Sequence, residues 1–133
     1  MEERSGGGRG GDLDRVIANL RALSEDIESC AVLSGDRDLI SSSHEPGVDR
    51  ERVGAMLAAL VNLSDRVARE SGKGHISQLR VDAGAGHLLV VRLDGGGVLA
   101  ATTGPDARVG LVLYDMRNSR GEVEKVLAEG SDR

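Results

Sequence analysis

Apolar residues recur at three- and four-residue spacing close to the start of the chain. From Leu13 to Ile27 they fall on one face of a helix, and Asp12 in front of them is a suitable N-cap. The pattern predicts an amphipathic helix of about four turns. The acidic pair Glu25 and Asp26 is then expected on the solvated side of that helix.

Two strand-like runs follow the first helix. CAVLS (30–34) and LISSS (39–43) flank the turn-forming residues 35–38, which predicts a β-hairpin. The next stretch, HEPGVD (44–49), contains Pro and Gly and ends at Asp49, a second plausible cap. It predicts a loop that leads into a new helix.

The second helix, over residues 50–70, is apolar almost all the way round in its first half. Between Val53 and Leu63 the sequence reads VGAMLAALVNL, in which only Asn62 is polar. A helix with one buried face shows a polar stripe in every turn, so this helix must be covered on two sides. One cover is its own sheet, and the other is a second copy of the protein or, alternatively, another layer of the same chain. Small residues that would let another helix approach closely are Gly54, Ala55, Ala58 and Ala59.

Three further strand-like runs follow a glycine-containing breaker at 71–74. They are joined by the glycine-rich turns AGAG and DGGG, so an antiparallel meander is predicted. If AGAG is a four-residue turn, Asp82 lies opposite His87, and His75 lies opposite Asp94. The three runs are HISQLRV (75–81), HLLVVRL (87–93) and VLAATT (98–103).

The last predicted element is a helix that starts at Pro105. Its apolar residues from Val109 to Leu127 share one face, and residues 118–121 weaken its middle, so fraying or a break is predicted there. The resulting order is α-β-β-α-β-β-β-α, and 133 residues suit one domain. The divisions are a flexible glycine-rich tail (1–11), the domain (12–128) and a C-terminal tail (129–133).

Composition excludes several classes of function. Hydrophobic residues make up 39% and charged residues 29%, as in soluble globular proteins, and a net charge of -5 gives no positive field to attract nucleic acid. With no Phe, no Trp and one Tyr, the chain has no row of rings to stack bases. It contains no membrane-spanning run, no secretory signal and no cysteine pair. These features predict a cytoplasmic protein without nucleic-acid binding or membrane insertion.

The sequence contains no recognisable catalytic, cofactor or metal site. The glycine-rich turns lack the GxxxxGK[ST] pattern of a phosphate loop, and no helix follows either of them directly. His44, His75 and His87 are not spaced as metal ligands. Cys30 has no basic residue within six positions that would activate its thiol. No enzyme is therefore predicted, and no cofactor.

Three segments together resemble the Roadblock/LC7 family. The run CAVLSGDRDLISSS corresponds to the family's hairpin of apolar residues around Asp-Gly. VGAMLAALVNLSDRVARES is similar to its alanine-rich helix, and GHLLVVRLDGGGVLAATTGPDARVGLVLYDM is similar to its C-terminal part. The resemblance extends over residues 12–127 and rests on the order and spacing of the segments rather than on one motif.

The resemblance implies a profilin-like fold of the α/β (α+β) class, with a five-stranded antiparallel sheet between helices. Family members usually form homodimers through the second helix and the third strand, which agrees with the second cover that residues 50–70 require. Pairing of the strand at 75–81 would also cover an open sheet edge. Mapped onto this chain, the dimer interface comprises Val53, Met56, Leu57, Ala59, Leu60, Leu63, Ile76, Gln78 and Arg80.

In function, bacterial members of the family resemble regulators of small Ras-like GTPases, often encoded beside a sensor kinase. The resemblance therefore implies a non-catalytic, dimeric adaptor that binds a small Ras-like GTPase, with a sensor kinase as a further partner. Nothing marks one of the arginines as a finger for a transferring phosphoryl group. Two alternatives stay open: a profilin-like domain that senses a small molecule, and a general scaffold without GTPase regulation. The lack of aromatic and convergent polar residues argues against the first.

Overall fold

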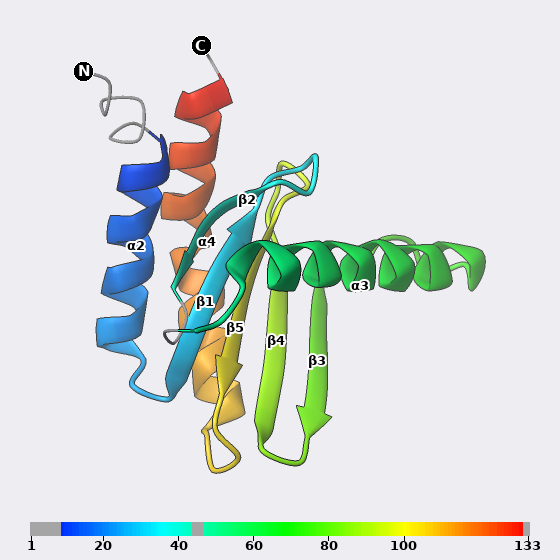
Figure 1. The fold of residues 1–133 in the computed structure, drawn as a ribbon. Helices are drawn as coiled ribbons and strands as arrows, with labels where there is room; N and C mark the ends of the chain where they lie inside the picture. The colour runs from blue at the N-terminus through cyan, green and yellow to red at the C-terminus, as the bar shows by residue number, and fades with distance from the viewer. Residues whose placement is uncertain (1–8, 44–46, 132–133) are drawn as a thin grey trace.

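In the part of the chain that the structure describes, three helices pack around one five-stranded sheet (Figure 1). The computed structural model describes residues 9–43 and 47–131. The order of elements is the predicted one, α-β-β-α-β-β-β-α. The elements are α2 (Arg9–Leu23), β1 (Ile27–Leu33), β2 (Leu39–Ser43), α3 (Arg50–Glu70), β3 (Gln78–Ala83), β4 (Gly86–Arg92), β5 (Val98–Thr103) and α4 (Val109–Ser131).

The sheet has the strand order β2-β1-β5-β4-β3, and every neighbouring pair is antiparallel. Helices α2 and α4 lie side by side on one face, and α3 crosses the other face (Figure 1). This three-layer arrangement is the predicted profilin-like fold. The strands at the two open edges of the sheet are β2 and β3.

Each face of the sheet has its own apolar core, because successive strand residues point to opposite faces. On β1, Val32 faces the layer of α2 and α4, whereas Ala31 and Leu33 face α3. The first core is the larger and includes Leu13 of α2 and Met116 of α4, both fully buried. The second core is small and is closed by α3 alone.

The first helix differs from its prediction at both ends. It begins at Arg9, before the predicted N-cap, and it ends at Leu23, so that Ile27 belongs to β1. Glu25 and Asp26 therefore lie in the connection and not on the helix. Ile27 is buried in the same core as the apolar residues of α2. Its spacing from them fits the last turn of a helix as well as the first residue of a strand, so the sequence pattern alone does not distinguish the two.

The last helix also differs from its prediction. Pro105 lies in the turn before it, and the helix is continuous from Val109 to Ser131 without a break at 118–121. Met116 and Val123, on either side of the predicted break, are both buried against the sheet and α2. This packing outweighs the weak helix propensity of Asn, Ser and Gly.

The predicted tails and the predicted loop are only in part within the described residues. Residues 1–8, 44–46 and 132–133 lie outside them. Of the predicted N-terminal tail, residues 9–11 belong to α2, and of the predicted C-terminal tail, residues 129–131 belong to α4. Asp49 is the N-cap of α3 as predicted, and its side chain accepts a hydrogen bond from the backbone N–H of Arg52.

Gly86, at the start of β4, is a position where only glycine fits. Its φ is 154°, and a Cβ built on it would lie 1.9 Å from the carbonyl oxygen of Thr103. We expect Gly86→Ala to lower the free energy of unfolding by about 2–3 kcal/mol in urea titrations. Gly84→Ala, two residues earlier in open space, is the matched control and should change it little. Equal effects of the two substitutions would contradict this explanation.

Candidate interaction surface

Helix α3 uses only a narrow stripe to pack on the sheet. Its buried residues are Gly54, Leu57, Val61 and Asp65, which follow one another at helical spacing. Leu57 and Val61 contribute to the smaller core. Apart from Ala58, which packs at the margin of this core, the rest of the apolar run from Val53 to Leu63 therefore lies outside it.

A second, exposed apolar stripe runs along one side of α3. Its residues alternate at spacings of three and four, the repeat of a helix that packs along another helix. Met56, Leu63 and Val67 are 56%, 59% and 60% exposed. Within the described chain α3 is thus not enclosed between two layers, which removes the single-chain alternative. We call this set the α3 stripe: Val53, Met56, Leu60, Leu63 and Val67.

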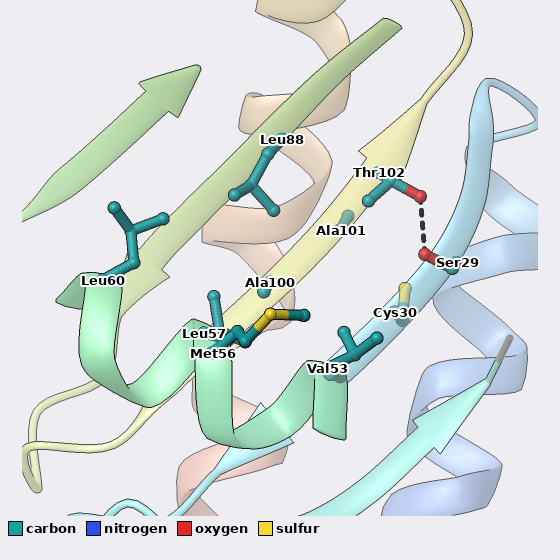
Figure 2. Close-up of a pocket in the computed structure, with 11 residues that line it drawn as sticks. Ser29, Cys30, Val53, Met56, Leu57, Leu60, Leu88, Ala100, Ala101 and Thr102 are labelled. Carbon is teal, nitrogen blue, oxygen red and sulfur yellow. Dashed lines mark hydrogen bonds between the residues drawn. The ribbon is translucent and has the colours of Figure 1, made fainter. Parts of the chain in front are cut away.

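The α3 stripe borders an apolar cleft of about 280 Å³ on the sheet. Figure 2 shows the side chains of α3 on one side of the cleft and Leu88 of β4 and Ala101 of β5 on the other. The polar side chains at its wall are Ser29 and Thr102, whose hydroxyl oxygens lie 2.5 Å apart and hydrogen-bond to each other. The cleft therefore presents apolar surface with its hydroxyls already paired.

The C-terminal part of α3 projects beyond β3, the edge strand of the sheet (Figure 1). Leu63 and Val67, the two most exposed residues of the α3 stripe, belong to this part. Beneath it the described residues provide no further strand, since β3 is the last in the sheet order. The sheet and the helix thus end at different places, and the helix carries apolar surface past the edge.

Charged side chains alternate along β3. The Nε of Arg80 lies 2.8 Å from Oδ1 of Asp82, and Nδ1 of His87 on β4 lies 2.7 Å from the same oxygen. These hydrogen bonds, that of Arg80 first, hold the pKa of Asp82 below its usual value. Because the whole of β3 is exposed apart from Leu79, the strand edge is open to another chain.

Asp65 anchors α3 to the sheet from a buried position. Its Oδ1 accepts a hydrogen bond of 2.9 Å from the backbone N–H of Ile76, and Nη1 of Arg92 lies 3.0 Å from Oδ2. Burial opposes the ionisation of Asp65, but the bonds from Ile76 and Arg92 outweigh it, so that its pKa is lowered. The carboxylate is therefore charged at neutral pH.

Arg37, in the turn between β1 and β2, completes this anchor. Its Nη2 lies 3.6 Å from Oδ2 of Asp65, its Nε donates to Oδ1 of Asn62 at 2.9 Å, and its Nη1 donates to the carbonyl oxygen of Gly96 at 2.5 Å. Its backbone has a φ of 69°, which is uncommon for a residue other than glycine. One side chain thus joins two turns of the sheet to α3 and fixes the helix across the strands.

The structure brings four of the predicted interface residues together in the α3 stripe: Val53, Met56, Leu60 and Leu63. Leu57 is only 7% exposed and is a core residue. Ala59 is exposed and lies three residues after Met56 and four before Leu63, so it borders the stripe on the side away from the sheet.

The three predicted interface residues near β3 differ in burial and in the face of the sheet to which they point. Ile76 packs against the core beneath α3, just before the strand begins. Gln78 and Arg80 are exposed on β3, and Oε1 of Gln78 accepts a hydrogen bond from Nη1 of Arg117 on α4. Gln78 and Arg80 thus point to the face that α4 covers, away from α3.

Two detailed predictions are wrong. Gly54 does not serve the approach of another helix, because a Cβ on it would lie 3.3 Å from Cβ of Leu39, in the hairpin of the same chain. His75 does not lie opposite Asp94, because β3 begins only at Gln78, and Nδ1 of His75 lies 3.9 Å from Oδ1 of Asp65 instead. The register that places Asp82 opposite His87 is confirmed.

Sequence reasoning missed three residues of this surface. Val67 continues the alternation of three and four residues beyond Leu63, so the signal was present in the spacing. Asp65 follows Gly54, Leu57 and Val61 at helical spacing, and a carboxylate in that series indicates a buried partner. No sequence signal identifies Leu88, because its place in the cleft depends on how α3 crosses the strands.

The described residues show few features of a chemical centre. They contain no group of three His, Cys, Asp or Glu side chains that could hold a metal ion. Burial raises the pKa of the Cys30 thiol to about 12, against the weaker effect of Arg21. In the same part of the chain, no helix is long and apolar enough to span a membrane.

Comparisons with known proteins agree with this fold. The Roadblock/LC7 domain model matches residues 13–103, which is more than half of the chain. A search of curated proteins found no match to this chain. The structure is similar to Myxococcus xanthus MglB, with a TM-score of 0.81, 16% identity and 90% of each chain covered. It is also similar to a Roadblock/LC7 domain from Streptomyces avermitilis, with a TM-score of 0.77, 22% identity and coverage of 86% of this chain and 97% of that one. For the gliding protein MglB from Thermus thermophilus the TM-score is 0.78, with 9% identity and coverage of 91% of this chain and 92% of that one. The chain belongs to the Roadblock/LC7 family.

Proposed function

We propose that the protein is a non-catalytic regulatory module of the cytoplasm that acts as a homodimer and binds a small Ras-like GTPase. The observation that carries the dimer is the α3 stripe, which continues past the last strand of the sheet. An apolar surface of this kind on a soluble protein is typical of a contact with another chain.

The proposed dimer has a two-fold axis at the β3 edge. Pairing of two β3 strands places the sheet of each copy beneath the projecting end of the other copy's α3. Leu63 and Val67 of one copy then cover the apolar cleft of the other, beside Met56 and Leu60. The two α3 helices run side by side along their stripes, which supplies the second cover that the sequence of α3 requires.

The charges on β3 support pairing of this strand with itself. In an antiparallel register centred on Val81, Arg80 of each copy lies opposite Asp82 of the other. Opposite charges at facing positions stabilise an antiparallel pair. The same pairing uses the backbone N–H and C=O groups that an edge strand leaves free.

GTPase binding is proposed on the ground of the family, whose bacterial members resemble regulators of small Ras-like GTPases. The exposed apolar surface of the α3 stripe supports a role through contact with another chain. A sensor kinase of the same pathway is a further proposed partner.

Capture from the native cell lysate tests the proposed function. The immobilised protein is incubated with lysate that contains either GDP or a non-hydrolysable GTP analogue. We expect mass spectrometry to find a small Ras-like GTPase that is retained in a nucleotide-dependent manner. Recovery of no GTPase above the level of beads without the protein would contradict GTPase binding and leave the dimer unaffected.

The apolar cleft also makes a small-molecule sensor a candidate, because about 280 Å³ would admit a small apolar ligand. Its two hydroxyls are paired with each other and give a ligand no free polar group for orientation. A thermal-shift screen distinguishes the two functions. A saturable stabiliser that competes with dimer formation would favour the sensor.

A further inference from the structure

The second open edge of the sheet, β2, is not used in the proposed dimer. Its sequence is LISSS, with no charged residue and no proline. Natural edge strands are usually protected by such residues, because their outer N–H and C=O groups can pair with another chain. In a dimer joined through β3, the two β2 strands form the two ends of the sheet.

A polar cleft of about 470 Å³ runs along this edge. On one side it is lined by α2, and on the other by the first residue of α3, Arg50. Ser42 and Ser43, which pair with Ala31 and Cys30, point to opposite faces of the sheet, and both line the cleft. The cleft therefore follows the edge of β2 itself and has the position that an added strand would occupy.

The cleft contains two arginines that form no ion pair with an acidic side chain among the described residues. The guanidinium of Arg21 donates to Oγ of Ser43 at 2.5 Å and to the carbonyl oxygen of Glu28 at 3.1 Å, both uncharged. Arg50 is exposed and forms no ion pair with a described residue. Among the described residues that line the cleft, Asp14 is the one acidic residue, and it accepts a hydrogen bond from the hydroxyl of Ser41.

Two buried polar atoms of the cleft residues lack a hydrogen-bond partner among the described residues. They are Nε of Arg21 and Oγ of Ser42. Buried polar groups are rarely left unpaired, since each costs roughly 1–3 kcal/mol. A small shift of either side chain on binding would let these atoms pair with an incoming chain.

We infer that the β2 edge binds an extended, acidic segment of a partner protein as an added strand, with its carboxylates near Arg21 and Arg50. A second copy of this chain fits the edge less well, because pairing of β2 with itself would bring two Arg21 and two Arg50 side chains together. On β3 the charges alternate and favour self-pairing. The inference depends neither on GTPase binding nor on the dimer.

Titration of the isotope-labelled protein with synthetic peptides, followed by NMR, tests this inference. The probe is a peptide of about eight residues in which Glu and Thr alternate, long enough for one strand. We expect saturable shifts confined to β2 and the facing residues of α2. A peptide with Lys in place of Glu, and the Glu peptide with alternate backbone nitrogens methylated, should each bind at least about tenfold more weakly.

Two variants with the same change of charge distinguish binding in the cleft from nonspecific electrostatic attraction of the peptide to the protein. Arg50→Glu should weaken binding of the Glu peptide at least about tenfold, and a Glu in the first turn of α3 is compatible with folding. Arg52→Glu, two residues away and outside the cleft, should leave binding unchanged. The inference is overturned if no saturable binding occurs, if the shifts map to β3, if the methylated peptide binds equally, or if both variants behave alike.

Discussion

Replacement of Leu63 by Glu is expected to convert the dimer into a folded monomer. Leu63 is 59% exposed in the single chain, so the substitution leaves both cores of the protomer intact. Because both copies of the proposed dimer carry the substitution, two carboxylates are placed in its apolar interface. Loss of the buried leucine alone costs about 2 kcal/mol per copy, so dissociation should become easier by about 4 kcal/mol or roughly 1,000-fold.

Sedimentation equilibrium over a range of concentrations measures this change. Leu23→Glu is the matched control, because Leu23 is a leucine of similar exposure, 66%, at the end of α2 and on the other face of the sheet. It should leave the dimer unchanged. A wild-type protein that is monomeric at high concentration, or a Leu63→Glu variant that dimerises like wild type, would contradict the proposed interface.

Leu57 and Leu60 separate folding from assembly within the same helix. Leu57 lies in the core beneath α3, so Leu57→Ala should lower the stability of the protomer by about 2–4 kcal/mol. Leu60 borders the cleft and belongs to the α3 stripe, so Leu60→Ala should act mainly on the dimer. Urea unfolding of each variant in a monomeric Leu63→Glu background compares the two. Equal loss of protomer stability in both would contradict this division.

The sequence predicted α3 closely because its signals are local. Asp49 caps it, the apolar run defines it, and the breaker at 71–74 ends it. The apolar run also indicated that α3 is covered on two sides, and the exposed α3 stripe is the side that the single chain leaves uncovered. The boundaries of α2 and the continuity of α4 were missed because Ile27 and Met116 take their roles from packing on the sheet, which local spacing does not encode.

The ionic contacts of Asp65 could not be predicted from the sequence, because they too depend on how the elements pack. Asp65, Arg37 and Arg92 are far apart in the chain and meet only because β4, the β1–β2 turn and α3 converge at one end of the sheet. Only the position of Asp65 on the buried face of α3 gave a local signal. The edge of β2 likewise became a candidate site only when the strand order was known.

Removal of the Asp65 carboxylate is expected to be among the most destabilising single changes in the protein. Asp65→Ala leaves Arg92 and Arg37, whose side chains are only 23% and 14% exposed, without their acidic partner, and it frees the N–H of Ile76. Loss of one partner of a buried ion pair typically costs about 3–5 kcal/mol. We therefore expect Asp65→Ala to lower the free energy of unfolding by about 3 kcal/mol in urea titrations.

Two comparisons make this prediction specific to burial and to charge. In the monomeric Leu63→Glu background, Asp82→Ala removes an exposed carboxylate that also contacts an arginine and a histidine, and it should change stability little, because exposed ion pairs contribute little. The folded-state pKa of Asp65 is lowered, so its contribution is complete above the ordinary aspartate pKa of about 3.9 and is lost as the pH falls through the lowered value. The stability difference between wild type and Asp65→Ala should thus be constant from pH 6 to 8 and should shrink only in acid. A difference that grows as the pH falls would show that the buried carboxylate does not stabilise α3 through its charge.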